Sequence, residues 1–142
     1  MKYLNFLIVT LFAFYACGAG SRQTPEQQKE GETWDAVMAQ HDVVMPLMGN
    51  THTLRKQLKS YLKEQDTKED SKITEAKNII TLLDKADESM MDWMQGFKKL
   101  GDLQSTRSHT EILQYLEDED QKMKKVKELF DTSIQQGKDF LK

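Results

Sequence analysis

The chain has 142 residues, enough for one modest domain, and 30% of them are charged. It contains only 7 Gly and 2 Pro, fewer turn-forming residues than a β-rich or loop-rich fold normally needs. The formal net charge is −3, and no long basic run is present, which weighs against a nucleic-acid-binding protein. The composition therefore favours an all-α protein that does not bind nucleic acid.

The first sixteen residues have the pattern of an export signal. Lys2 supplies a positive charge, and the apolar stretch of about 13 residues that follows is shorter than the ~20 needed to span a bilayer. We therefore predict a signal peptide over residues 1–16.

Cys17 is the only cysteine, and it directly follows this apolar stretch, between Ala16 and Gly18. The arrangement resembles the lipobox of bacterial lipoproteins, in which the leader is cut before a lipidated cysteine. The resemblance implies that Cys17 anchors the chain to a membrane of the cell envelope. Because no acidic run directly follows Cys17, we expect the protein to face the periplasm. The alternative is an ordinary cleaved leader with an incidental cysteine. Residues 17–32, rich in Gly, Ser, Gln and Glu, are expected to include a flexible tether.

From Trp34 onward, apolar residues recur at steps of three and four, the spacing of one helix face. Two polar breaks, at 65–71 and 101–108, divide this region. We expect helices near 33–65, 72–100 and 108–141. Because the links are short, the domain at 33–142 is predicted to be an antiparallel, up-down-up three-helix bundle. Pro46 has no backbone N–H, so the first helix should kink there or split, which gives four helices.

Methionine is frequent, with 8 residues, and most of these fall in two short segments, 34–48 and 90–94. A turn centred near Lys68 would bring the two segments to one height in the bundle. The second turn is expected to bring Ile112 and Tyr115 to the same height.

These segments carry soft metal ligands. Thioether sulfur together with imidazole selects Cu(I) over hard cations. His41 and Met45 lie four residues apart, so they share a helix face. Met91 and Met94, three apart, do the same, and Trp93 could lie over a bound cation. The predicted Cu(I) ligands are His41, Met45, Met91 and Met94, with Met38, Met48 and Met90 in reserve. The alternative is that the methionines only fill the core.

A second set of polar residues, His52, Asp87 and Glu119, occupies positions expected to face the seam. A His–carboxylate set could bind Zn²⁺. Because buried carboxylates are costly unless they are paired, the favoured interpretation is a layer that is partly solvated, or a polar pairing that fixes helix register.

The methionine segments resemble a group of small predicted Bacteroidetes lipoproteins that often carry the label "viral A-type inclusion protein". The resemblance covers Trp34 to about Leu100. The residues that carry it are Trp34, Met38, His41-Asp42, Met45-Pro46, Met48 and Met90-Met91-Asp92-Trp93-Met94. It implies a helical lipoprotein and supplies no activity.

Catalytic signatures are missing from the sequence. There is no Gly-rich phosphate loop, no Gly-x-Ser-x-Gly, no His-Glu-x-x-His and no Cys-x-x-Cys-His. We therefore expect a binding protein rather than an enzyme, with Cu(I) as the first candidate ligand. The alternative is an envelope structural or protein-interaction lipoprotein, with a partner helix or a second copy on its exposed seam.

Overall fold

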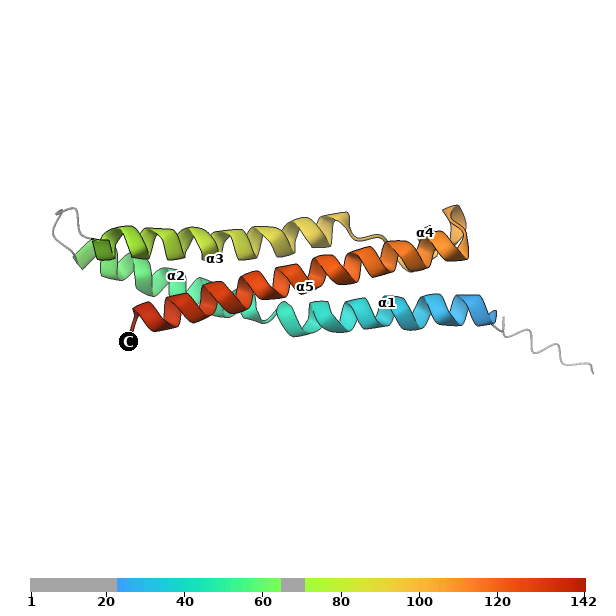
Figure 1. Ribbon diagram of the computed structural model, residues 1–142, viewed down its shortest axis with the longest axis horizontal. Helices are drawn as coiled ribbons and strands as arrows, with labels where there is room; N and C mark the ends of the chain where they lie inside the picture. Colours follow the sequence, from blue (N-terminus) through green and yellow to red (C-terminus); the bar gives the residue numbers. More distant parts are fainter. Residues whose placement is uncertain (1–22, 65–70) are drawn as a thin grey trace, which may run out of the picture.

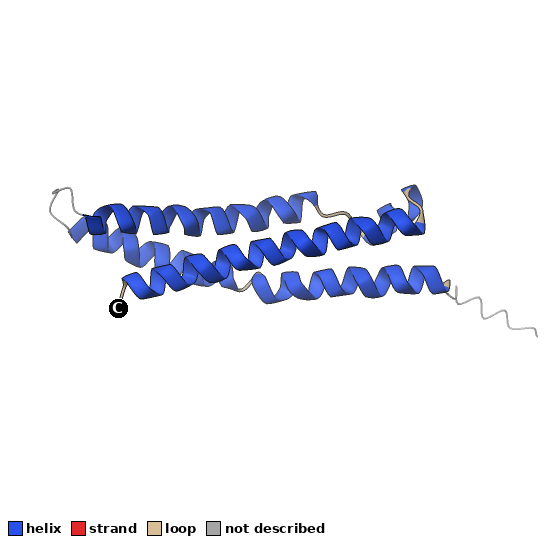
Figure 2. Cartoon of the chain, in the orientation of Figure 1, coloured by secondary structure: helices blue, strands red, loops and turns tan. Residues whose placement is uncertain are grey.

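The computed structural model describes residues 23–64 and 71–142, which form an all-α bundle without a strand in either range (Figure 2). The helices are α1 (Pro25–Val44), α2 (Leu47–Glu64), α3 (Ser71–Gly96), α4 (Leu100–Thr106) and α5 (His109–Phe140). α1 and α2 follow one another along the first pass, α3 returns beside α2, and α5 runs along all of them (Figure 1). The predicted up-down-up bundle, with its first helix split, is confirmed.

α1 begins at Pro25, well before the expected start at residue 33. Thr24 caps it: its side chain accepts a hydrogen bond from the Gln27 N–H at 3.1 Å, and the Gln27 side chain accepts one from the Thr24 N–H at 3.0 Å. The predicted tether is therefore wrong for residues 25–32, whose Gln, Glu and Lys are good helix formers once capped. Cys17 and the signal segment lie outside the described residues.

The break near Pro46 has the expected cause. α1 ends at Val44, and Met45 still donates its N–H to the His41 carbonyl at 2.8 Å. Pro46 cannot make the next bond, and the chain passes through a tight turn before Leu47 starts α2. The first pass is therefore bent in the middle (Figure 1).

α4 occupies a stretch that the sequence analysis treated as a break. α3 ends at Gly96, and α4 brings Leu103 against Ile112 and Leu116 of α5, where all three are buried. This small second cluster explains why the link folds into a helix: it covers apolar surface at the end of α5.

α5 is the central element of the packing. α3 packs along α5 and against α2, and α1 packs on α5. The backbones of α1 and α3 stay more than 8 Å apart at every Cα, so large side chains fill the space between them. The largest fully buried side chains are Phe130, Leu58, Leu83, Met90, Ile112, Leu116 and Met123. All residues of both apolar clusters lie between Trp34 and Phe140, so a chain of residues 23–142 contains the whole described core.

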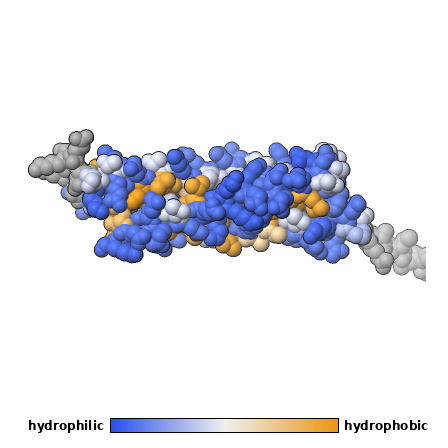
Figure 3. Space-filling model, viewed as in Figure 1, coloured by the Kyte–Doolittle hydropathy of each residue, from blue (hydrophilic) through white to orange (hydrophobic). Residues whose placement is uncertain are grey.

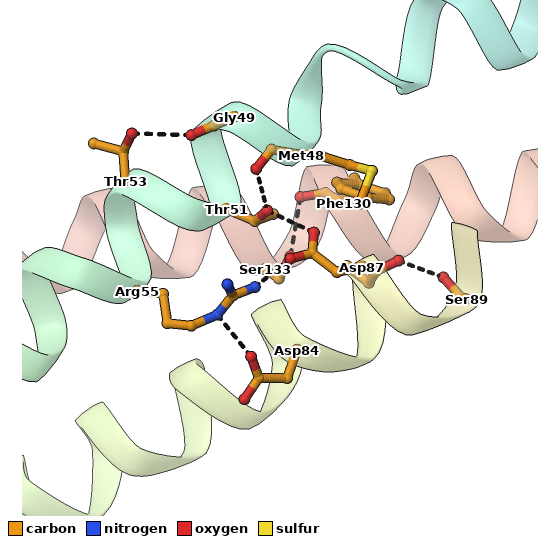
Figure 4. A network of polar contacts seen from close by, with 11 residues as sticks. Met48, Gly49, Thr51, Thr53, Arg55, Asp84, Asp87, Ser89, Phe130 and Ser133 are labelled. Atoms are coloured by element: carbon orange, nitrogen blue, oxygen red, sulfur yellow. Dashed lines mark hydrogen bonds and ion pairs between the residues drawn. The ribbon is translucent and has the colours of Figure 1, made fainter. Parts of the chain in front are cut away.

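A polar network joins α2 to α3 (Figure 4). Arg55 pairs with Asp87 and places its Nε 2.6 Å from Asp84. Thr51 donates to Asp87 at 2.6 Å. The predicted set of His52, Asp87 and Glu119 does not form, because Asp87 bonds to Arg55 and Thr51 instead.

The other two members of that set lie elsewhere. His52 is exposed. Glu119 is buried and accepts a hydrogen bond from Lys122, one turn further along its own helix, at 2.8 Å. Polar pairing is present, but the partners differ from the predicted ones.

A second buried carboxylate, that of Glu30, lies near the end of the bundle where α1 begins. Glu30 of α1 is 4% exposed and accepts hydrogen bonds from His109 of α5 and Gln104 of α4, both at 2.8 Å. Burial pushes the pKa of Glu30 upward, but the two hydrogen bonds and the nearby His109 outweigh it and hold the pKa below its ordinary value. Glu30 lies in the expected tether, where no buried residue was predicted.

Candidate functional site

One face of α1 turns a stripe of large side chains toward α3. Trp34, Met38, His41 and Met45 follow each other at steps of four, three and four, so they share a helix face. The Trp34 ring lies 5.8 Å from that of Phe97, centroid to centroid. The His41 ring stacks on Trp93 at 5.6 Å, with 25° between the ring planes. These two ring contacts fix the direction of the whole stripe.

On α3, Met91 and Met94 lie on the side turned away from α5. The groove between α3 and α5 is lined by Ser89, Asp92 and Gly96, which mark one flank of α3. Met91 and Met94, three residues apart, fall on the opposite flank at 100° per residue. The two helices therefore bring Met38, His41, Met45, Met91 and Met94 to one side of the bundle, here called the methionine face.

The predicted height of the two segments is confirmed by the stacking of His41 on Trp93. The predicted position of α5 along the bundle axis, relative to α3, is wrong by about one helical turn. Tyr115 stacks on Phe97, at 6.2 Å, and the α5 residues that line the same groove as Trp93 begin only at Glu119. α4 lengthens the link before α5 and accounts for the shift.

His41 has the hydrogen bonding of a potential metal ligand. Its side chain is 16% exposed, and its Nδ1 lies 2.9 Å from a carboxylate oxygen of Asp42. A carboxylate only accepts hydrogen bonds, so Nδ1 is the donor in this contact, and Nε2 is the nitrogen that a neutral imidazole would offer to a metal ion. Metal-binding histidines commonly have this arrangement, in which a carboxylate orients the ring.

The predicted thioethers differ in exposure. Met45 and Met91 reach the surface, at 38% and 43% exposed. Met38, Met48 and Met94 are half-buried against the main cluster, and Met90 is fully buried. Met90 therefore serves the core, whereas Met45, Met91 and Met94 remain accessible from the methionine face. Among the described residues, no group of three or more His, Cys, Asp or Glu side chains could hold a metal ion.

The groove between α3 and α5, of about 420 Å³, was not foreseen from the sequence. Trp93, Val126 and Leu129 form its apolar part, and Glu119 and Lys122 stand at its polar side. The hydrogen bond to Glu119 raises the pKa of Lys122. The space-filling view shows hydrophobic residues in strips between hydrophilic rows rather than in one broad patch (Figure 3).

Comparisons of the chain with protein-family models, with curated proteins and with solved structures found no match. Within residues 23–64 and 71–142, no helix is both long enough and apolar enough to cross a membrane.

Proposed function

We propose that the chain is a lipid-anchored, periplasm-facing envelope protein that binds Cu(I) on its methionine face. The observation that carries the proposal is the set of contacts that the His41 side chain makes. Its Nδ1 is bonded to Asp42 and its ring is stacked on Trp93, so Nε2 is the atom left to bind a ligand. His41 also lies on a stripe between Met38 and Met45.

The donor set suits a soft monovalent ion. Thioethers and a neutral imidazole carry no charge, so they favour Cu(I) over hard cations, which prefer oxygen ligands. Thioethers also resist disulfide formation in an oxidising compartment, where thiol ligands would be lost. The exposure of Met45 and Met91 fits a protein that takes up an ion and releases it again.

The test is a Cu(I) titration of residues 23–142 against a competing chelator. The variant Met45→Leu, Met91→Leu removes the two surface thioethers, and Met90→Leu, Met123→Leu is the matched control because both residues are fully buried. We expect one Cu(I) per chain, unchanged affinity in the control, and at least about 100-fold weaker binding in the test variant. Equal binding in the two variants, or no binding at all, contradicts the copper proposal.

A second candidate rests on exposed apolar side chains beside the kink. Met45 is 38% exposed and Met91 is 43% exposed, and both lie on the methionine face. Methionine-rich surfaces adapt to many partner shapes. An envelope structural or interaction protein would use this face to hold another protein. Two results together would support this function. The wild type does not bind copper, and a partner protein that co-purifies with it is lost in the Met45→Leu, Met91→Leu variant.

The membrane anchor has its own test. Cys17→Ser in the full chain should move the protein from the membrane fraction to the periplasmic fraction and abolish incorporation of labelled fatty acid. Retention at the membrane with unchanged labelling contradicts lipidation at Cys17.

A further inference from the structure

The outer face of α2 carries a row of basic residues. His52, Lys56, Lys59 and Lys63 follow at steps of four, three and four, opposite the buried Leu58. The row extends about 16 Å along the helix. With Arg55 and Ser60, these side chains surround an open hollow of about 380 Å³, and all of its lining residues come from α2.

No acid in residues 23–64 or 71–142 pairs with the lysines of this row, Lys56, Lys59 and Lys63. Lys122, Lys124 and Lys127 of α5, in contrast, each pair with an acid three or four residues away.

The arrangement is also locally repulsive. Lys59 stands three residues from Lys56 and four from Lys63, and like charges at these spacings repel. The two acids nearest on α3, Asp84 and Asp87, are engaged by Arg55, and Glu64 accepts a hydrogen bond from Ser60. A bound anion would relieve this repulsion.

We propose that the α2 row, Lys56, Lys59 and Lys63, binds the phosphate headgroups of an anionic lipid surface. The exposed residues of α2 include no large apolar side chain, so the face lacks the anchors on which protein partners depend. Clustered lysines are attracted to the negative surface of an anionic bilayer, each by about 1 kcal/mol. The choice of a membrane over other polyanions rests on the proposed export of the chain and is independent of Cu(I).

The positions of α1 and α2 set the orientation that the bundle would take on the membrane. The start of α1 and the far end of α2 lie at opposite ends of the bundle (Figure 1). With an anchor before α1, contact through α2 would lay the bundle along the bilayer surface.

The test is sedimentation of residues 23–142 with vesicles of phosphatidylcholine, with and without phosphatidylglycerol. The variant is Lys56→Gln, Lys59→Gln, Lys63→Gln. The matched control, Lys77→Gln, Lys85→Gln, Lys138→Gln, removes the same charge from exposed lysines that form no ion pair with a described residue. Each lysine near a lipid surface contributes about fivefold to binding, so the variant should bind about 100-fold more weakly to the anionic vesicles.

We expect binding only to the anionic vesicles, little change in the control, and circular dichroism that matches the wild type for both variants. Equal loss in both variants, or no binding to anionic vesicles, overturns the proposal. Displacement by inorganic phosphate that exceeds the effect of chloride at equal ionic strength would identify a free-phosphate site instead.

Discussion

Replacing Arg55 by Met removes the only cation in the polar network between α2 and α3. In the wild type, the guanidinium pairs with Asp87 and lies 2.6 Å from Asp84, and its side chain is 16% exposed. Met keeps most of the apolar stem but supplies no charge. The substitution leaves Asp87 with Thr51 as its hydrogen-bond donor.

The expected loss of folding stability follows from how exposed the Asp84 and Asp87 side chains are. The Asp87 side chain is 21% exposed, so water only partly replaces the lost cation, and a charge-assisted hydrogen bond of this kind is worth about 1.5–3 kcal/mol. Asp84 is 48% exposed and adds at most about 1 kcal/mol. We therefore expect Arg55→Met to lower the free energy of unfolding by about 1.5–4 kcal/mol.

The assay is urea unfolding of residues 23–142 followed by circular dichroism. Lys56→Met is the matched control: the neighbouring residue is exposed, forms no ion pair with a described residue, and should cost less than about 0.5 kcal/mol. Asp87→Asn in the Arg55→Met background should recover part of the loss, because it removes the unpaired charge. A cost for Arg55→Met no larger than that of Lys56→Met would refute the reasoning.

Three further predictions concern the ends of the bundle. Because the pKa of Glu30 is lowered from 4.5, its contribution to stability is present above pH 4.5 and is lost as the pH falls through the lowered value. Urea unfolding midpoints measured from pH 6 to about pH 3 should fall less steeply in Glu30→Gln than in the wild type, because Gln cannot titrate. The same slope in both proteins would contradict the account of the Glu30–His109 contact. Gly31→Ala should stabilise α1 by about 0.5–1 kcal/mol in thermal melts, because nothing lies within 4 Å of the added Cβ. Gly137→Val should instead cost about 1–3 kcal/mol, since even a Cβ there lies 3.2 Å from a methyl carbon of Leu54; a neutral effect would show that α2 and α5 can separate freely.

Helical periodicity and one proline were sufficient to predict the main architecture. The stripe that starts at Trp34 identified the face of α1 that meets α3, and Pro46 identified the break in the first pass. The start of α1 could not be recognised from composition, because Gln, Glu and Lys are common both in tethers and in capped helices. Thr24 followed by Gln27 was the available signal, since this spacing forms a capping box.

The polar contacts were harder to predict than the helices. A position on a helix face is set by spacing, but the partner of a long side chain depends on small shifts along the helix axis. Arg55 reaches Asp87 from α2 and so replaces the expected partners His52 and Glu119. The link that contains α4 moved α5 by about a turn, so Tyr115 lies at Phe97 and not at the methionine segment of α3.

The central claim is that Cu(I) binds on the methionine face, and NMR of the methionine methyl groups tests it most directly. Residues 23–142 with labelled methionine methyls would be titrated with Cu(I) under reducing conditions. The account predicts that the methyl signals of Met45, Met91 and Met94 shift and saturate at one ion per chain, while Met123, fully buried on α5, stays unchanged. No shift at these three residues, or an equal shift at Met123, would contradict it.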